Sequence, residues 1–153
     1  IELRERLAQI SAELIVGALG RLTTLEATPQ GQTGILHAAP MKKSDSILDF
    51  GRSATDLHNQ IRAFFPWPGS QTMFRGEQFK IHRARVIGGL EKPGLPGEIL
   101  VAKKRMIVAC GTDALEIIEA QLPGKKPLPI QSILNGARIQ VGEFLNQDPG
   151  ETP

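Results

Sequence analysis

Residues 61–68, with the sequence Ile-Arg-Ala-Phe-Phe-Pro-Trp-Pro, constrain the fold of this chain more than any other stretch. They include three of the seven aromatic residues, the only Trp among them, and two of the eleven prolines. An amphipathic pattern runs through residues 53–64, and the sequence Ser53-Ala54-Thr55-Asp56 at its start resembles a capping box that would open a helix. The pattern must end here, because proline lacks a backbone donor and disfavours helical geometry in the residue before it. We expect the two Phe rings and the indole to be buried together. The stretch therefore predicts a junction between a helix and a β-rich core.

Residues 1–22 carry one apolar stripe at three- and four-residue spacing, which is typical of an amphipathic helix. Its members are Leu3, Leu7, Ile10, Leu14, Ala18 and Leu22. Ser11 followed by Glu13 leaves open whether this is one bent helix or two short ones. Such a stripe needs a partner to pack on, and the sequence starts inside the pattern without a Met. We therefore expect residues 1–22 to be the end of a domain that begins upstream.

Residues 23–40 are rich in Thr, Gln, Gly and Pro, and they predict a linker. We expect a second domain at residues 41–146 and a frayed tail at residues 147–153. Beyond Pro68 the apolar period changes from 3.6 to 2, which indicates strands.

Five strands are expected in the second domain, the second of them with a bulge where its alternation slips. They are residues 70–75, 78–87, 98–102, 106–110 and 115–122. A short helix at residues 129–135, capped by Gly136, follows them. The predicted fold class is mainly β with helices, an OB-like small barrel preceded by the last helical piece of another domain.

The chain has 41% hydrophobic and 22% charged residues, an ordinary folded composition. Its single cysteine, Cys110, excludes an internal disulfide and a Cys-cluster metal site, which fits a reducing cytoplasm. Cys110 follows apolar residues, so we expect a buried, inert thiol. No apolar run is long enough to span a bilayer, and we expect no membrane partner.

No catalytic, cofactor-binding or metal-ligating residues are expected within this chain. The three histidines, His37, His58 and His82, lack metal-ligand spacing with one another and with Cys110. The glycines of residues 88–97 are not followed by a helix that would hold a phosphate.

Basic residues are the more informative group. Residues 37–146 contain 15 Lys and Arg against 10 Asp and Glu. Such cations can follow a phosphate backbone, although hairpin tips and edge strands also carry Lys for solubility, and the residues alone leave both explanations open. Few exposed aromatic residues are expected among them, so backbone contact is favoured over base stacking. The candidate nucleic-acid-binding residues are Lys42, Lys43, Lys80, Arg83, Arg85, Lys103, Lys104, Arg105, Lys125 and Lys126.

Residues 61–68 resemble the signature Ile-Arg-Ala-Phe-Asn-Pro-Trp-Pro of the methionyl-tRNA formyltransferase family, with Phe65 in place of Asn. Residues 47–50, Ile-Leu-Asp-Phe, resemble the family's Ile-Asp-Trp element, and residues 96–100 its Pro-Gly-x-Ile strand. Residues 122–128 resemble the Gln-Pro-x-Gly-Lys-Lys-x-Met loop with one residue absent. Four motifs in order make the resemblance specific to the family's C-terminal domain.

The resemblance implies a full-length enzyme that transfers a formyl group from 10-formyltetrahydrofolate to the amine of methionyl initiator tRNA. It further implies an N-terminal Rossmann-like domain with the catalytic residues and the folate pocket, and a C-terminal OB-like barrel that holds the tRNA. Residues 1–22 would then end the catalytic domain, and this chain would be inactive alone and bind no cofactor itself. Two alternatives stay open. One is a free-standing OB-like binding module, and the other is a related enzyme whose barrel binds no tRNA. Related folate-dependent hydrolases and sugar formyltransferases share both domains, and their barrel only supports the catalytic domain.

Overall fold

The structure is a computed structural model that describes residues 2–29, 31–90 and 93–146 of the chain. The chain divides into two units, Ile1–Pro40 and Met41–Pro153. The predicted tail, residues 147–153, lies outside the described residues.

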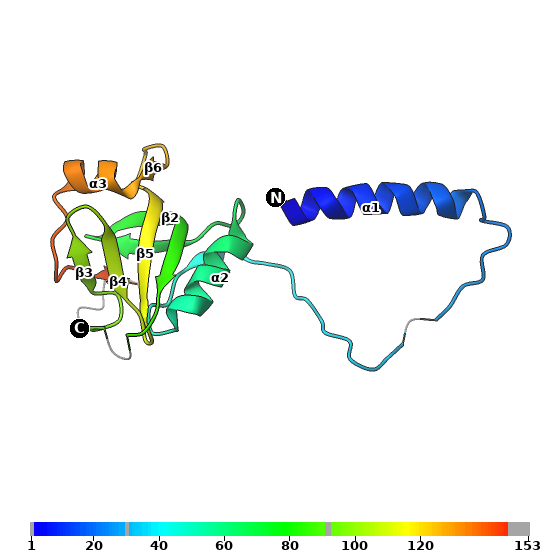
Figure 1. Ribbon diagram of the computed structural model, residues 1–153, viewed down its shortest axis with the longest axis horizontal. Helices are drawn as coiled ribbons and strands as arrows, with labels where there is room; N and C mark the ends of the chain where they lie inside the picture. Colours follow the sequence, from blue (N-terminus) through cyan, green and yellow to red (C-terminus); the bar gives the residue numbers. More distant parts are fainter. Residues whose placement is uncertain (1, 30, 91–92, 147–153) are drawn as a thin grey trace. The chain divides into compact units, whose positions relative to one another are not determined.

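The first unit consists of α1 (Glu2–Leu19) and the chain that follows it (Figure 1). α1 is one continuous helix, so the alternative of two short helices is wrong. No residue of this described helix is buried, and its apolar residues Leu3, Leu7 and Leu14 are exposed. Among the described residues, no helix is long and apolar enough to cross a membrane.

In its described residues, the second unit contains a short 3-10 helix, two α-helices and seven strands in one sheet. In chain order these are η1 (Lys43–Ser46), α2 (Ala54–Phe64), β1 (Gln71–Phe74), β2 (Glu77–Ile87), β3 (Ile99–Ala102), β4 (Met106–Ala109), β5 (Ala114–Gln121), β6 (Leu128–Pro129), α3 (Ile130–Ala137) and β7 (Leu145–Asn146). The predicted fold class, a mainly β small barrel-like domain with helices, is confirmed, and β1 to β5 lie where five strands were expected. The two-residue strands β6 and β7 were not expected.

The sheet is antiparallel, and its order is β3-β4-β5-β2-β1-β7, with β6 paired to β5. The two ends of this order also meet. Ile99 N donates a hydrogen bond to Glu143 O at 2.8 Å, and Leu145 N donates to Gly97 O at 2.9 Å. These bonds join the segment around β7 to the start of β3, so the strands wrap around a common core as Figure 1 shows.

The predicted bulge in β2 is confirmed. The pairing of β2 with β5 shifts register between Ile81 and Arg83 and again between Arg83 and Ala84. Before the shift Ile81 faces the core, and after it Ala84 and Val86 pack against the core. The extra residue therefore bends β2 while apolar side chains stay on its inner face.

α2 begins where its capping sequence predicts. Ser53 Oγ accepts a hydrogen bond from Asp56 N at 3.1 Å and thereby satisfies one of the unpaired donors of the first turn. Leu57 and Ile61 form the buried face of the helix. This face packs on β2 and β5, and the hydrophobic core extends from it to Leu48 in the segment after η1.

The turn after α2 contradicts the expected buried cluster of rings. Phe65 is 45% exposed and Trp67 is 62% exposed. Both X-Pro peptide bonds of residues 65–68 are cis, and Gly69 N donates to Phe64 O at 2.9 Å. The physical reason is that residues of other elements, such as Phe79 of β2, already fill the core beneath α2. The chain reverses outside that core with these two rings at the surface.

The C-terminal end of α3 also differs from expectation. The helix continues through Gly136 to Ala137, and Arg138 takes the left-handed conformation (φ 48°) that ends it. Gly136 has an open environment, so its position does not require glycine, and the proposed glycine cap is wrong.

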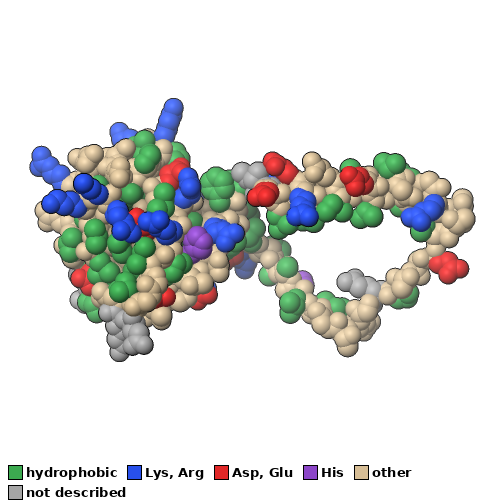
Figure 2. All heavy atoms as spheres, in the orientation of Figure 1, with side chains coloured by type: hydrophobic (Ala, Val, Ile, Leu, Met, Phe, Trp, Pro, Cys, Tyr) green, Lys and Arg blue, Asp and Glu red, His purple; other side chains and the backbone are tan. Residues whose placement is uncertain are grey.

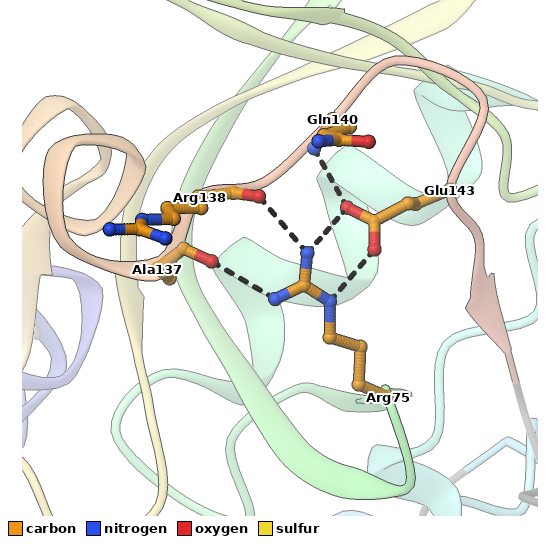
Figure 3. Close-up of polar contacts among 5 residues, drawn as sticks. All are labelled: Arg75, Ala137, Arg138, Gln140 and Glu143. Carbon is orange, nitrogen blue, oxygen red and sulfur yellow. Dashed lines mark hydrogen bonds and ion pairs between the residues drawn. The ribbon is translucent and has the colours of Figure 1, made fainter.

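Arg75, in the turn between β1 and β2, ties the end of α3 to the segment before β7 (Figure 3). Its Nε and Nη2 donate to both carboxylate oxygens of Glu143 at 2.7 and 2.9 Å. Nη1 and Nη2 also donate to the carbonyls of Ala137 and Arg138, each at 3.0 Å. The hydrogen bonds from Arg75 lower the pKa of Glu143, so the pair stays charged at neutral pH.

Candidate functional site

Most of the predicted nucleic-acid-binding residues gather on and around the outer face of β2 and β5. The register places Arg85 opposite Glu116 and Arg83 opposite Glu119, while Lys80 lies opposite Gln121. In Figure 2 the Lys and Arg side chains of the barrel spread across one face, and a His side chain lies beside them.

Glu116 holds two of these arginines together. Its side chain is only 6% exposed and accepts from Arg85 Nε at 2.6 Å and from Arg105 Nε at 2.6 Å. Arg105 Nη2 makes a second bond to the carboxylate at 2.9 Å. Since each guanidinium has five N–H donors, both retain donors that Glu116 does not use. Their side chains are 61% and 47% exposed, so those donors can reach a ligand from solvent.

The two guanidinium groups change the titration of Glu116. Hydrogen bonds from Arg105, and then from Arg85, lower the pKa of this carboxyl group although burial opposes them. Glu116 is therefore ionised at neutral pH, and one carboxylate opposes two cations. A net positive charge remains at this point of the surface, and its position is fixed by the shared carboxylate.

Gln121 at the end of β5 connects β2 to the lysine loop, the loop that contains Lys125 and Lys126. Its Oε1 forms a hydrogen bond of 2.9 Å with His82 Nε2, and its Nε2 donates to Lys125 O at 2.7 Å. The backbone of Lys125 is thus held beside β2, and its side chain and that of Lys126 are exposed. The Lys-Lys sequence of the loop extends the row of cations on β2 at this end.

The turn between β3 and β4 adds further cations. Lys103 and Lys104 precede Arg105 in this turn and are exposed. Because Arg105 is fixed to Glu116, the turn lies against the β5 side of the same surface. We call the resulting surface the basic face. It consists of Lys80, His82, Arg83, Arg85, Lys103, Lys104, Arg105, Lys125 and Lys126.

Lys42 and Lys43, two further predicted residues, lie apart from this surface at the start of η1. Leu48 N donates to Gln71 O at 2.9 Å, which places the segment after η1 along β1. β1 pairs with β2 by its other edge. One strand therefore separates that segment from the basic face.

Sequence reasoning missed three features of this surface. Glu116 was not singled out, although a lone acid between Leu115 and Ile117 must face away from a core. No pattern in the sequence predicts the hydrogen bonds that Gln121 makes with His82 and Lys125. The edge-on contact of Phe65 with His82 of the basic face, at 6.4 Å between ring centroids, was not expected either.

Other chemistry is sparse in the described part of the chain. His, Cys, Asp and Glu side chains form no group of three there that could hold a metal ion. Cys110 is buried as predicted, and this burial raises the pKa of its thiol to about 12. A protonated, enclosed thiol is a packing residue of the core, because the thiolate is the nucleophilic form.

Solved structures resemble this chain in fold. HypX from Aquifex aeolicus, in a crystal structure in complex with tetrahydrofolic acid, superposes with a TM-score of 0.58 at 19% sequence identity. The match covers 92% of this chain and 25% of that protein.

Curated relatives share more of the sequence. A methionyl-tRNA formyltransferase of Dechloromonas aromatica is 42% identical over 142 residues, which cover 92% of this chain and 45% of the relative. The same name is given to relatives from Carboxydothermus hydrogenoformans, 43% identical, and from Koribacter versatilis, 41% identical. The chain spans slightly less than half the length of each of these proteins.

A family model covers most of the barrel unit. The formyl transferase C-terminal domain matches residues 40–138, a range that contains α2, the turn of residues 65–68 and every strand from β1 to β6. All cations of the basic face also lie within it. Family model and relatives agree with the four sequence motifs, and the chain therefore belongs to the formyl transferase family, of which it carries the C-terminal domain.

Proposed function

We propose that this chain is the tRNA-holding C-terminal part of a methionyl-tRNA formyltransferase. The observation that carries the proposal is the charge of the basic face. Its Lys and Arg residues face two acids, Glu116 and Glu119, and Glu119 makes only a long ion pair of 4.0 Å with the exposed Arg83. Within the described residues, the ion pairs of the chain are made by arginines, and the lysines of this face take part in none of them.

Such a surface suits a polyphosphate. Phosphate contacts by Lys and Arg release counterions and supply most of the sequence-independent affinity of a protein for nucleic acid. Arg85 and Arg105 are held in place by Glu116, and a fixed guanidinium presents paired donors that match phosphate oxygens. The lysines at the two ends of the face, in the β3–β4 turn and the Lys-Lys loop, are suited to neighbouring phosphates of a folded RNA.

The proposal extends to a longer protein, because the relatives are about twice as long as this chain. In that protein an N-terminal Rossmann-like domain would transfer the formyl group from 10-formyltetrahydrofolate to methionyl initiator tRNA in the cytoplasm. Residues 1–22 would close that domain, residues 23–40 would be the linker, and residues 41–146 would hold the tRNA. The exposed apolar stripe of α1 supports this assignment, since no described residue of its own unit buries it.

A binding experiment with initiator tRNA tests the proposal. We expect the chain to bind at low salt, and a variant with Lys103, Lys104, Lys125 and Lys126 changed to Gln to bind at least about tenfold more weakly. Arg52→Gln is the matched control. It removes one exposed charge near the β4–β5 turn, at the end of β4 away from Lys103, and should leave affinity unchanged.

Equal binding by the parent and the fourfold variant, or no binding by either, would contradict the proposal. That outcome would favour the alternative in which the barrel only supports a catalytic domain, as in related sugar formyltransferases and hydrolases. Circular dichroism of both variants separates lost contacts from lost folding, because all five substituted residues are exposed.

A further inference from the structure

The turn of residues 65–68 presents two flat rings to solvent. The chain has seven aromatic residues, all within the described ranges, and only Phe65 and Trp67 among them are exposed. The other rings, such as Phe74 and Phe79, are buried or half-buried. Aromatic exposure is thus confined to one turn of the molecule.

This turn continues the basic face. The ring of Phe65 meets the imidazole of His82 edge-on, with 6.4 Å between centroids and an interplanar angle of 87°. His82 lies in β2 between Lys80 and Arg83, and it is bonded to Gln121 beside the lysine loop. A ligand whose phosphates follow the cations of β2 therefore comes within reach of the aromatic turn.

Exposed aromatic rings beside a row of cations indicate the kind of nucleic acid that a surface binds. Proteins that bind unpaired nucleotides place basic groups along the backbone and stack the bases on aromatic side chains, which every base permits because each has a π-face. A paired stem offers only its groove edges and phosphates. A surface with lysines and arginines alone would suit a stem, whereas the added rings suit a nucleotide outside one.

We propose that Trp67, in the same turn as Phe65, stacks on an unpaired base of the RNA whose backbone lies on the basic face. The inference rests on the proposed function, and it adds a ligand chemistry, an unpaired nucleobase, to the phosphates considered above. Trp67 is the platform because its indole is the larger and the more exposed ring. Phe65, two residues before Trp67, contacts His82 and thereby places the turn beside the cations of β2.

Trp67 itself reports on this contact, because it is the only tryptophan of the chain. Titration with initiator tRNA should quench its fluorescence, and the bound state should shield it from acrylamide, a neutral quencher. Trp67→Ala should weaken tRNA binding about tenfold, the loss typical of one stacked base, and leave the salt slope unchanged. Trp67→Phe retains a ring and should restore most of the affinity.

Val141→Ala is the matched control, since Val141 is 63% exposed and lies in the segment before β7. It should bind as the parent does. A tRNA duplex stem without loops or single-stranded ends should bind with a similar salt slope and leave Trp67 open to acrylamide.

Two results would overturn stacking while the proposed function stands. One is a salt-dependent complex in which Trp67→Ala binds like the parent and Trp67 remains fully quenchable. The other is shielding of Trp67 without RNA in a longer protein that joins this chain to an N-terminal half, which would assign the turn to a contact between domains. Absence of any tRNA binding by the parent would instead refute the proposed function, and stacking with it.

Discussion

Glu116 determines the geometry of the basic face at the scale of single residues. It is the one nearly buried acid among the cations of this surface, and it receives hydrogen bonds from Arg85 and Arg105. Without the carboxylate, two guanidinium groups would repel each other at close range. The acid therefore stabilises the fold and also keeps two guanidinium groups at fixed positions.

We predict that Glu116→Gln lowers the free energy of unfolding at pH 7 by about 1–2 kcal/mol. Hydrogen bonds between charged groups contribute about 1.5–3 kcal/mol, and solvent around the exposed arginines reduces this. Glu119→Gln is the control, because its ion pair with Arg83 is long and exposed, and its change should stay within about 0.5 kcal/mol. Urea denaturation of the three proteins measures both effects.

A comparison of the parent with Glu116→Gln also tests the pKa of Glu116, which the two arginines lower. A carboxyl group with a lowered pKa in the folded state stabilises fully above its unfolded pKa of about 4.3, and this stabilisation is lost as the pH falls toward the folded pKa. The stability difference between parent and Glu116→Gln should therefore shrink on acidification from pH 6 to about pH 3. A constant difference across this range would contradict the assignment.

Gly97 lies at a position where both the backbone conformation and the space around it require glycine. Its φ is +85°, and an added Cβ would collide with the carbonyl oxygen of Leu145, where β7 meets the start of β3. We predict that Gly97→Ala destabilises the chain by about 2 kcal/mol or more, because strain and collision add. Gly136→Ala in α3 is the control and should be neutral or stabilising by up to about 1 kcal/mol. Thermal unfolding that ranks the two variants in the opposite order would refute this.

At the scale of elements, the turn of residues 65–68 separates what the sequence could predict from what it could not. Local rules located α2, its cap at Ser53 and its end before the two prolines, because caps and prolines act within a few residues. Whether Trp67 is buried depends on the space left by distant residues. Phe79 and Leu48 are buried in one core cluster with Leu57 and Ile61 of α2, and no local pattern reports this packing.

The exposure of Trp67 changes the expected cost of its removal. A fully buried Trp replaced by Ala would cost about 3–5 kcal/mol. Since the side chain is 62% exposed, we predict less than about 1 kcal/mol for Trp67→Ala. Ile61→Ala in the same region, with a side chain 2% exposed, should cost about 2–5 kcal/mol. Equilibrium unfolding in urea compares the two, and similar losses would show that the indole is packed after all.

The basic face shows the same division between local and distant information. Lysines at turns, such as Lys103 and Lys125, were predictable because a turn exposes its side chains. The sharing of Glu116 by Arg85 and Arg105 depends on strand register across β4, β5 and β2, which sequence spacing does not specify. The hairpin β1–β2 and the bulge were predictable, whereas the two-residue strand β7, which joins β1 to β3, was too short to carry a pattern.

At the scale of the whole molecule, the barrel combines an anchored row of cations with an aromatic turn at its side. The positive charge of the barrel is concentrated on β2, beside β5, and in the β3–β4 turn and the lysine loop. The entire chain has a formal charge of only +2. Under the proposed function, this concentration of charge on one surface would let a nearly neutral chain bind a polyanion. The membership of the chain in the formyl transferase family indicates which polyanion to test.

Salt dependence of binding to initiator tRNA tests the central claim most directly. The association constant should be measured between about 50 and 200 mM monovalent salt for the parent chain and for the variant with Lys103, Lys104, Lys125 and Lys126 changed to Gln. If the basic face contacts about five phosphates, the logarithm of this constant should fall linearly with log salt with a slope of about −4, and the variant's slope should be shallower by about 3. A slope near zero for the parent, or equal slopes for both proteins, would contradict the account.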